Sequence, residues 1–242
     1  MSDSVQNGTI FLVPTVIAPD THHQVLSPQI LEVVNATNYY LVENIRTARR
    51  FLSAISIKTP INQLQFELLD KKTSPEELPT LMQPALTGHN IGIMSEAGCP
   101  GIADPGALAV SYAHQKGLRV VPLVGPSSIL LALMASGFSG QSFTFHGYLP
   151  IDKDKRGRAI KSLEKQSQQH RQTQIFMETP YRNNQLFSDV IKHCHPRTLI
   201  CVARDISGPN EYIKTLPVHA WQKKKLELHK VPTVFLLSSI RG

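Results

Sequence analysis

The chain has 242 residues, of which 41% are hydrophobic and 18% are charged, and its formal net charge is +7 because 25 basic residues oppose 18 acidic ones. This composition is typical of globular proteins and excludes disordered and fibrous architectures. The length allows one large domain or two smaller ones, and the basic balance favours polyanionic partners such as nucleic acid.

Short apolar runs alternate along the chain with segments of helical periodicity. The apolar runs predict buried strands at residues 10–13, 39–42, 91–94, 119–124, 175–177, 199–202 and 234–237. The periodic segments predict helices at residues 28–36, 46–55, 105–115, 127–135, 156–169 and 182–193. Strands and helices in alternation predict the α/β class, with a mostly parallel sheet covered by helices.

Two stretches interrupt this alternation. Residues 58–88 contain four prolines, and residues 137–155 contain three glycines and run into a charged segment, so both are predicted to be largely irregular. The strands divide unevenly around the turn at residues 125–126. We therefore expect an N-terminal α/β domain of residues 1–122 and a C-terminal α/β domain of residues 123–242.

Cysteine usage and hydropathy indicate a cytoplasmic protein. Cys99, Cys194 and Cys201 cannot all pair and show no C-x-x-C spacing, which favours a reducing compartment. The polar N-terminus lacks the order of a signal peptide, and the uncharged stretch at residues 120–151 is interrupted by prolines and glycines, so no membrane span is predicted. The HCH run at residues 193–195 is too compact to converge on one ion, and no metal site is predicted.

The segment richest in glycine is MSEAGCPGIADPG at residues 94–106, between a predicted strand and a helix for which Asp104 is the expected N-cap. Bare backbone lets another molecule approach, and ligands bind at the carboxyl ends of strands in open α/β sheets. The segment matches neither G-x-G-x-x-G nor a phosphate-binding loop. A second loop, VGPSS at residues 124–128, also joins a strand to a helix. The two loops either hold a ligand between them or are simple tight connections.

The order of these motifs resembles the tetrapyrrole methylase superfamily. The resemblance rests on SEAGCPGIADPG, VVPLVGPSS, the later FHGYLP and ETPYR, and shorter matches along nearly the whole chain. Within the superfamily the chain is most similar to the bacterial enzymes that methylate a ribose 2′-hydroxyl of 16S ribosomal RNA.

The resemblance implies two α/β domains with S-adenosylmethionine in the cleft between them, usually in a homodimer. The family's cofactor-contacting positions fall on Pro14, Ala97, Gly98, Cys99, Ile102, Ser127, Ser128, Met177, Ala203, Pro232 and Thr233. Apolar walls and backbone hydrogen bonds suit adenosine, and the sulfonium tolerates no fixed cation nearby.

Two motifs depart from the family pattern. The ribosomal RNA enzymes typically read A-T-P-I-G-N in the first loop, where this chain reads PTVIAP at residues 14–19 and lacks the glycine and the asparagine. They read E-D-T-R-H-T-R where this chain reads ENIRTAR at residues 43–49, so an acid and a hydroxyl are missing at the edge of the substrate cleft. We expect these changes to affect substrate identity more than cofactor binding.

The implied reaction is an in-line attack of a ribose hydroxyl on the sulfonium methyl, without a metal. Glu43 and Arg46 are the candidate catalytic residues, as an acid that orients or deprotonates the hydroxyl beside a phosphate-binding arginine; the alternative is a surface ion pair. Candidates for substrate binding are Arg49, Glu178 and Arg182.

The leading hypothesis is therefore an S-adenosylmethionine-dependent methyltransferase acting on a ribose of small-subunit ribosomal RNA. One alternative is a methyltransferase of the same fold that acts on a tetrapyrrole or another small molecule. Another is a catalytically silent RNA-binding or ribosome-binding protein, because the loops at residues 14–19 and 43–49 are altered.

Overall fold

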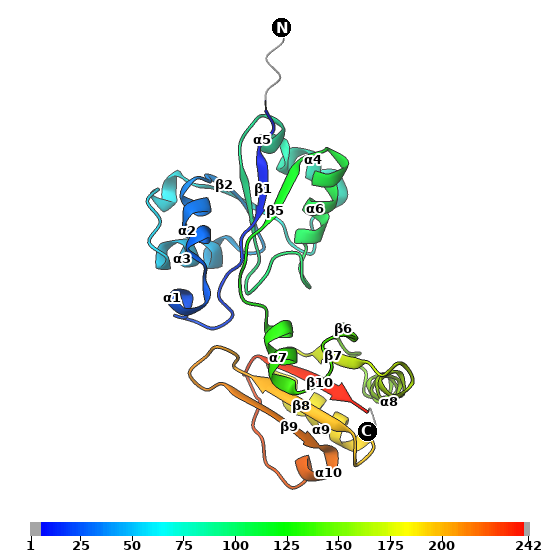
Figure 1. Cartoon of the computed structure of the whole chain (residues 1–242). Helices are drawn as coiled ribbons and strands as arrows, with labels where there is room; N and C mark the ends of the chain where they lie inside the picture. Colours follow the sequence, from blue (N-terminus) through cyan, green and yellow to red (C-terminus); the bar gives the residue numbers. More distant parts are fainter. Residues whose placement is uncertain (1–5, 240–242) are drawn as a thin grey trace. The chain divides into compact units, whose positions relative to one another are not determined.

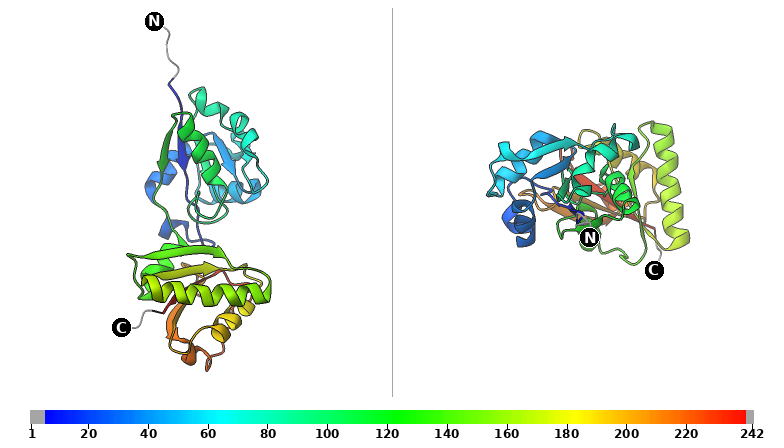
Figure 2. Two further views of the ribbon diagram at one scale, coloured as in Figure 1. Left: turned by 90° about the vertical axis from the view of Figure 1, so that its right-hand side faces the viewer. Right: turned by 90° about the horizontal axis from the view of Figure 1, so that it is seen from above.

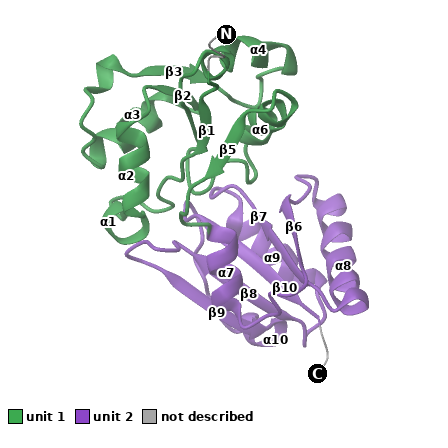
Figure 3. Cartoon of the chain, turned by 45° about the horizontal axis from the view of Figure 1, so that its top comes forward, with its two compact units in different colours: residues 1–127 green, residues 128–242 purple. Residues whose placement is uncertain are grey.

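The computed structural model describes residues 6–239 and confirms the α/β class. The chain divides into two compact units, unit 1 of residues 1–127 and unit 2 of residues 128–242 (Figure 3). The division follows Ser127, whereas the sequence prediction placed the domain boundary after Pro122.

Unit 1 is built on a sheet of five parallel strands in the order β3-β2-β4-β1-β5. The strands are β1 (Thr9–Leu12), β2 (Tyr39–Val42), β3 (Gln65–Leu68), β4 (Ile91–Met94) and β5 (Arg119–Pro122). Every residue of β4 is buried, as expected for a strand inside a parallel sheet covered on both faces.

Helices cover both faces of this sheet (Figure 1). One hydrophobic cluster joins Tyr40 and Val42 to the first long helices, and the other joins Leu41 to the later ones, because successive strand residues point to opposite faces. The helical segments are α1 (His22–Val25), α2 (Pro28–Asn35), α3 (Ile45–Ala54), η1 (Ile61–Gln63), η2 (Pro75–Glu77), α4 (Leu78–Leu81), α5 (Gln83–Leu86) and α6 (Gly106–Gln115).

The neighbouring strands β1 and β4 send their connections to opposite faces of the sheet. The chain leaves β1 through α2, which packs in the cluster around Tyr40, and leaves β4 through α6, which packs in the cluster around Leu41. Such a divergence is the topological switch point at which open α/β sheets bind their ligands.

Unit 2 contains a mixed sheet of five strands in the order β6-β7-β10-β8-β9, in which only β6 and β7 pair in parallel. The strands are β6 (Phe143–Tyr148), β7 (Thr173–Met177), β8 (Leu199–Arg204), β9 (Tyr212–Pro217) and β10 (Thr233–Ser238). The expectation of mostly parallel pairing is therefore wrong for unit 2. Parallel neighbours need a long crossover connection, and no helix as long as α8 lies between β8 and β9 or between β9 and β10.

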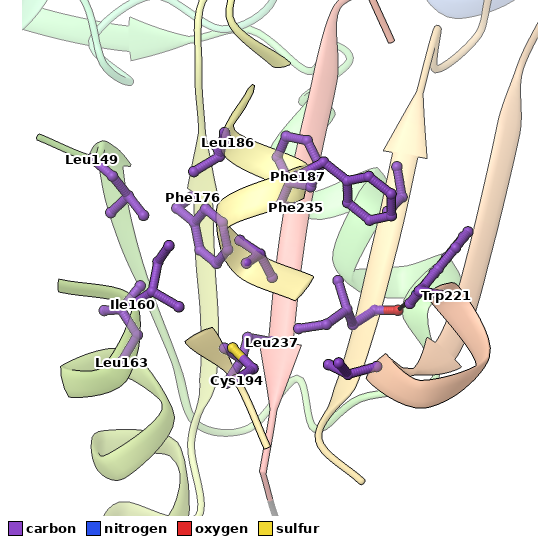
Figure 4. Close-up of a cluster of buried hydrophobic side chains, with 14 of the residues drawn as sticks. Leu149, Ile160, Leu163, Phe176, Leu186, Phe187, Cys194, Trp221, Phe235 and Leu237 are labelled. Atoms are coloured by element: carbon purple, nitrogen blue, oxygen red, sulfur yellow. Dashed lines mark hydrogen bonds between the residues drawn. The ribbon is translucent and has the colours of Figure 1, made fainter. Parts of the chain in front are cut away.

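Four helices accompany this sheet, α7 (Ser128–Ser136), α8 (Lys153–His170), α9 (Asn183–His193) and α10 (Val218–Trp221). The helix α7 contacts β8, β9 and β10, whereas α8, α9 and α10 contribute to one cluster on the other face (Figure 4). Figure 2 shows the long helix α8 lying along the sheet of unit 2. Within the cluster, the ring of Phe187 packs edge-on against Trp221.

The seven predicted strands and six predicted helices are all present, with boundaries shifted by a few residues. The sequence missed β3, β6 and β9, and both β3 and β6 lie in stretches predicted to be irregular. All three are edge strands, which leave many side chains exposed or half-buried and so lack the continuous apolar run of an interior strand.

A buried ion pair joins the two long helices of unit 2. Arg156 on α8 donates through Nη2 to Oδ2 of Asp189 on α9 at 2.5 Å, and both side chains are about 95% buried. The same guanidinium donates through Nη1 to the carbonyl of Ile151 at 2.7 Å. Removing one partner leaves the other charged group buried without its counter-ion.

We expect Asp189→Ala to lower the free energy of unfolding by about 3 kcal/mol, because it leaves the Arg156 guanidinium uncompensated. Asp154→Ala, at an exposed position on α8, is the control and should change stability by less than about 1 kcal/mol. Denaturant unfolding followed by circular dichroism measures both, and equal effects would contradict the importance of the pair.

Candidate active site

Three loops meet at the carboxyl ends of β1, β4 and β5. The amide of Thr15, after β1, donates to the carbonyl of Gly98, after β4, at 2.9 Å. The thiol of Cys99 donates to the carbonyl of Pro126, after β5, at 3.3 Å. These contacts bring together five of the predicted cofactor positions, namely Pro14, Ala97, Gly98, Cys99 and Ile102, beside the switch point.

The loops approach each other so closely that a glycine is required after β5. A Cβ built on Gly125 would lie 2.2 Å from Cβ of Pro14, a distance at which no side chain fits. The VGPSS loop is therefore packed against the first loop through bare backbone. Ser127 and Ser128 follow, at the end of unit 1 and the start of α7.

The glycine-rich loop holds three left-handed residues, Gly98 with φ +76°, Gly101 with φ +82° and Ala103 with φ +64°. The Asp104 carboxylate fixes this conformation, because its Oδ1 accepts from the amides of Gly101 and Gly106 at 2.8 and 2.7 Å. The sequence predicted Asp104 as a helix cap, and the helix itself begins at Gly106, one residue later than predicted.

Two large apolar side chains are exposed in these loops. Ile102 is 54% exposed and Val124 is 75% exposed, whereas Pro14 and Gly98 are buried. Val124 was not among the predicted site residues, although it lies in the VGPSS motif. Apolar side chains beside exposed backbone suit the apolar part of a small ligand.

Charge is distributed unevenly around these loops. Residues 13–19, 95–106 and 123–128 contain no lysine or arginine but include Glu96 and Asp104. Burial, with Asp104 adding, raises the pKa of the Cys99 thiol above its ordinary value, so this thiol stays protonated at neutral pH. The three loops therefore offer a neutral to negative environment.

Glu43, at the end of β2, is linked to the glycine-rich loop. The amide of Glu96 donates to Glu43 Oε2 at 3.0 Å, and the hydroxyl of Thr47 donates to Glu96 Oε1 at 3.4 Å. Burial, together with the nearby Asp104 and Glu96 carboxylates, raises the pKa of Glu43 above its ordinary value. Glu43 therefore holds its proton more tightly than an ordinary glutamate does.

The alternative reading of Glu43 and Arg46 as a surface ion pair is not supported. Within residues 6–239 the ion pairs involve other residues, and Arg46 is exposed at the start of α3. The helix is capped by Asn44, whose Oδ1 accepts from the amides of Arg46 and Thr47. Arg49 is exposed on the same helix, with its guanidinium 5.3 Å from the ring centroid of Phe66.

The predicted cofactor residues of unit 2 gather at one end of its sheet. Met177 on β7 and Ala203 on β8 pair with Val234 of β10 from opposite sides, next to Thr233. The carbonyl of Pro232 accepts from the amide of Asp205 at 2.9 Å. Ala203 is fully buried and Thr233 is 6% exposed, so these two positions would offer a ligand mainly their backbone atoms.

Glu178 and Arg182 form an ion pair directly after β7. The guanidinium Nη2 lies 2.7 Å from Glu178 Oε1, with the glutamate side chain 1% exposed and the arginine side chain 40% exposed. Although burial acts to raise it, the hydrogen bonds from Arg182 and from the Thr179 amide hold the pKa of Glu178 below its ordinary value. Glu178 is therefore an ionised anchor that positions Arg182.

The described part of the chain holds neither a cluster of metal ligands nor a membrane-spanning helix. No group of three histidine, cysteine, aspartate or glutamate side chains within residues 6–239 is placed to hold a metal ion. None of the described helices is both long enough and apolar enough to cross a membrane.

Comparison with known proteins identifies the family. No family model matches the chain. The chain is 30% identical over 217 residues to the ribosomal RNA small subunit methyltransferase I of Vibrio cholerae, covering 89% of this chain and 71% of that protein. The chain belongs to the ribosomal RNA small subunit methyltransferase I family. The protein of that name from Escherichia coli O157:H7 is 29% identical over 233 residues, which span 95% of this chain and 77% of that one.

The structural comparison agrees on the fold. The methyltransferase CobJ superposes with a TM-score of 0.62 at 16% identity, covering 96% of this chain and 94% of that one. At this identity the match shows the shared tetrapyrrole methylase fold, which the sequence motifs predicted.

Two left-handed glycines offer a matched test of the loop packing. A Cβ on Gly98 would lie 3.2 Å from Ile17 Cγ2 and 3.3 Å from the carbonyl of Pro126, whereas a Cβ on Gly101 would meet nothing within 4 Å. We expect Gly101→Ala to lower the free energy of unfolding by about 1 kcal/mol through backbone strain alone. Gly98→Ala should lower it further, because Ile17 and Pro126 must also shift. Equal losses in denaturant unfolding would contradict this packing.

Proposed function

We propose that this chain transfers a methyl group from S-adenosylmethionine to the 2′-hydroxyl of a ribose in small-subunit ribosomal RNA. The names of its relatives and its net charge of +7 support this substrate. The observation that carries the proposal is the meeting of three loops with bare backbone at the β1/β4 switch point. The proposal includes a cytoplasmic location, which the cysteine usage favours, and a homodimer, which the family resemblance implies.

The residues present in unit 1 fit S-adenosylmethionine. Its sulfonium carries a positive charge, and the three loops contain Glu96 and Asp104 but no lysine or arginine. Its adenosine is apolar on both faces, and Ile102 and Val124 expose apolar side chains in the same loops. We propose that Pro14, Ala97, Gly98, Cys99, Ile102, Ser127 and Ser128 bind the cofactor. The family resemblance also assigns cofactor contacts to Met177, Ala203, Pro232 and Thr233.

The bound cofactor supplies an electrophilic methyl group, and the chain's own residues position the acceptor. Glu43 orients the ribose hydroxyl and accepts its proton, for which a raised pKa is an advantage at neutral pH. Arg46 and Arg49 are exposed on α3 and bind phosphates, and Arg182 does so after β7, held by Glu178. Positioning of the hydroxyl contributes much of the rate.

Methyl transfer to RNA is the direct test. We expect tritium from labelled S-adenosylmethionine to enter undermethylated small ribosomal subunits or their RNA, because the site offers both a cofactor environment and exposed arginines. A related active enzyme is the positive control. If the cofactor binds in calorimetry but no RNA is labelled, the chain is a silent RNA-binding homologue or acts on a small molecule; if the cofactor does not bind, the proposal fails.

Glu43→Gln separates a catalytic role from a structural one. Glutamine keeps an oxygen to accept from the Glu96 amide but cannot take a proton, so transfer should fall about 100-fold. In the parent the rate should rise with pH through the raised pKa of Glu43, and the variant should lack this rise.

Although Glu43→Gln should lose activity, it should not lose stability. Because the folded state binds the Glu43 proton more tightly than the unfolded chain, ionisation lowers stability as pH rises through that pKa. Glu43→Gln should therefore be at least as stable as the parent at neutral pH. Glu67→Gln, at an exposed glutamate on β3, is the control for both measurements. A variant that is less stable and fully active would contradict the assignment.

A further inference from the structure

An aromatic ring is exposed beside two basic side chains in unit 2. Tyr181, between β7 and α9, is 69% exposed, although tyrosine rings usually cover part of a core. Nζ of Lys230 lies 6.0 Å from its ring centroid, and the ring of His229 stands edge-on at 6.0 Å. The three side chains combine a free π surface with positive charge.

Backbone and side-chain hydrogen bonds hold this arrangement in place. The amide of Lys230 donates to the carbonyl of Pro180 at 2.9 Å, and Nδ2 of Asn183 donates to the carbonyl of Val231 at 2.7 Å. Lys230 itself has a left-handed backbone, φ +60°, which persists only where the surroundings impose it. The ring and the backbone that carries Lys230 are thus preorganised, which lowers the entropy lost when a partner binds.

A groove of about 540 Å³ is connected to this ring through Glu227, which lines the groove and accepts a hydrogen bond from the amide of His229, the residue whose ring contacts Tyr181. Lys224 and Lys225 line it, and Asn184, three residues after Tyr181, forms part of its rim together with Glu227. The single carboxylate in the lining is engaged, because Glu227 Oε1 accepts from Nδ2 of Asn184 and from the amide of His229. Lys224, Lys225 and Glu227 are all exposed, so the lining carries two positive charges and one negative charge.

A second lysine–tyrosine pair shows that a tyrosine can contact a lysine while its own ring is mostly buried. In unit 1, Nζ of Lys116 lies 5.5 Å from the ring centroid of Tyr112, and that tyrosine is only 9% exposed. The ring of Tyr112 contributes to a hydrophobic cluster, whereas Tyr181 belongs to none of the three clusters. Core packing therefore accounts for the position of Tyr112, whereas Tyr181 contributes to no hydrophobic cluster of the described residues.

We propose that Tyr181 is a stacking platform for a base of single-stranded RNA and that Lys230, Lys224 and Lys225 bind the adjoining phosphates. An exposed aromatic ring next to a basic groove is the combination by which proteins bind single strands, since every base has a π face. A duplex does not fit as well, because its bases are already stacked on one another. This inference rests on the proposed function, to which it adds a surface outside the cofactor loops.

Fluorescence anisotropy with a labelled single-stranded oligoribonucleotide of mixed sequence tests the platform. We expect Tyr181→Ala to weaken binding about tenfold and Tyr181→Phe to bind like the parent, because phenylalanine keeps the ring. Lys230→Ala and Lys225→Ala should each lower the slope of log affinity against log salt by about one. Lys116→Ala is the matched control and should leave both affinity and slope unchanged. Thermal melting checks that each variant is folded.

The outcomes separate this inference from the proposed function. If Tyr181→Ala binds the single strand like the parent, or if Lys116→Ala weakens binding as much as Lys230→Ala, the platform is overturned even where the parent methylates RNA. If the parent transfers no methyl group to RNA but loses affinity on Tyr181→Ala, the surface stands and the proposed function fails. Equal affinity of the parent for a labelled duplex would also overturn the stacking role.

Discussion

The constraint on which unit 1 depends is the divergence of the chain at the adjacent parallel strands β1 and β4. The connection after β1 passes to one face of the sheet, and the connection after β4 passes to the other face. The loops that leave these two neighbouring strands therefore meet with no helix between them. The hydrogen bond from Thr15 to Gly98 closes this junction, and β5 adds a third loop whose Gly125 leaves room for Pro14. The bare backbone of the candidate site is thus a consequence of how the sheet is connected.

Electrostatics gives this junction its chemical character. The three loops contain acids without lysine or arginine. Exposed arginines lie on α3, the half-buried Arg182 follows β7, and lysines line the groove beside α10. A protein with a net charge of +7 has many basic side chains to place, and their exclusion from these loops suits a cationic sulfonium. The same chain therefore offers one environment for a cation and others for a polyanion.

The sequence predicted the interior strands and long helices, because strands such as β4 and β10 are apolar at almost every position and helices such as α3 are periodic. It missed β3, β6 and β9, whose side chains are partly exposed at sheet edges. The glycine-rich loop was recognisable from its composition, but the left-handed Ala103 and the contact between Glu43 and Glu96 were not, since these depend on tertiary packing. Val124 was missed because a single valine after a strand resembles the strand's continuation.

Glu43 and Glu178 show why position after a strand does not define a role. Both glutamates directly follow a buried strand, so their local position in the sequence is the same. Glu178 accepts from Arg182 and from the Thr179 amide, which hold its pKa low and fix it as an ionised anchor. Glu43 accepts one amide beside two other carboxylates, and burial raises its pKa. When the surroundings of two carboxyl groups push their pKa values apart, the two groups suit different roles. In the proposed function, Glu43 accepts the proton, and Glu178 holds the Arg182 guanidinium in place.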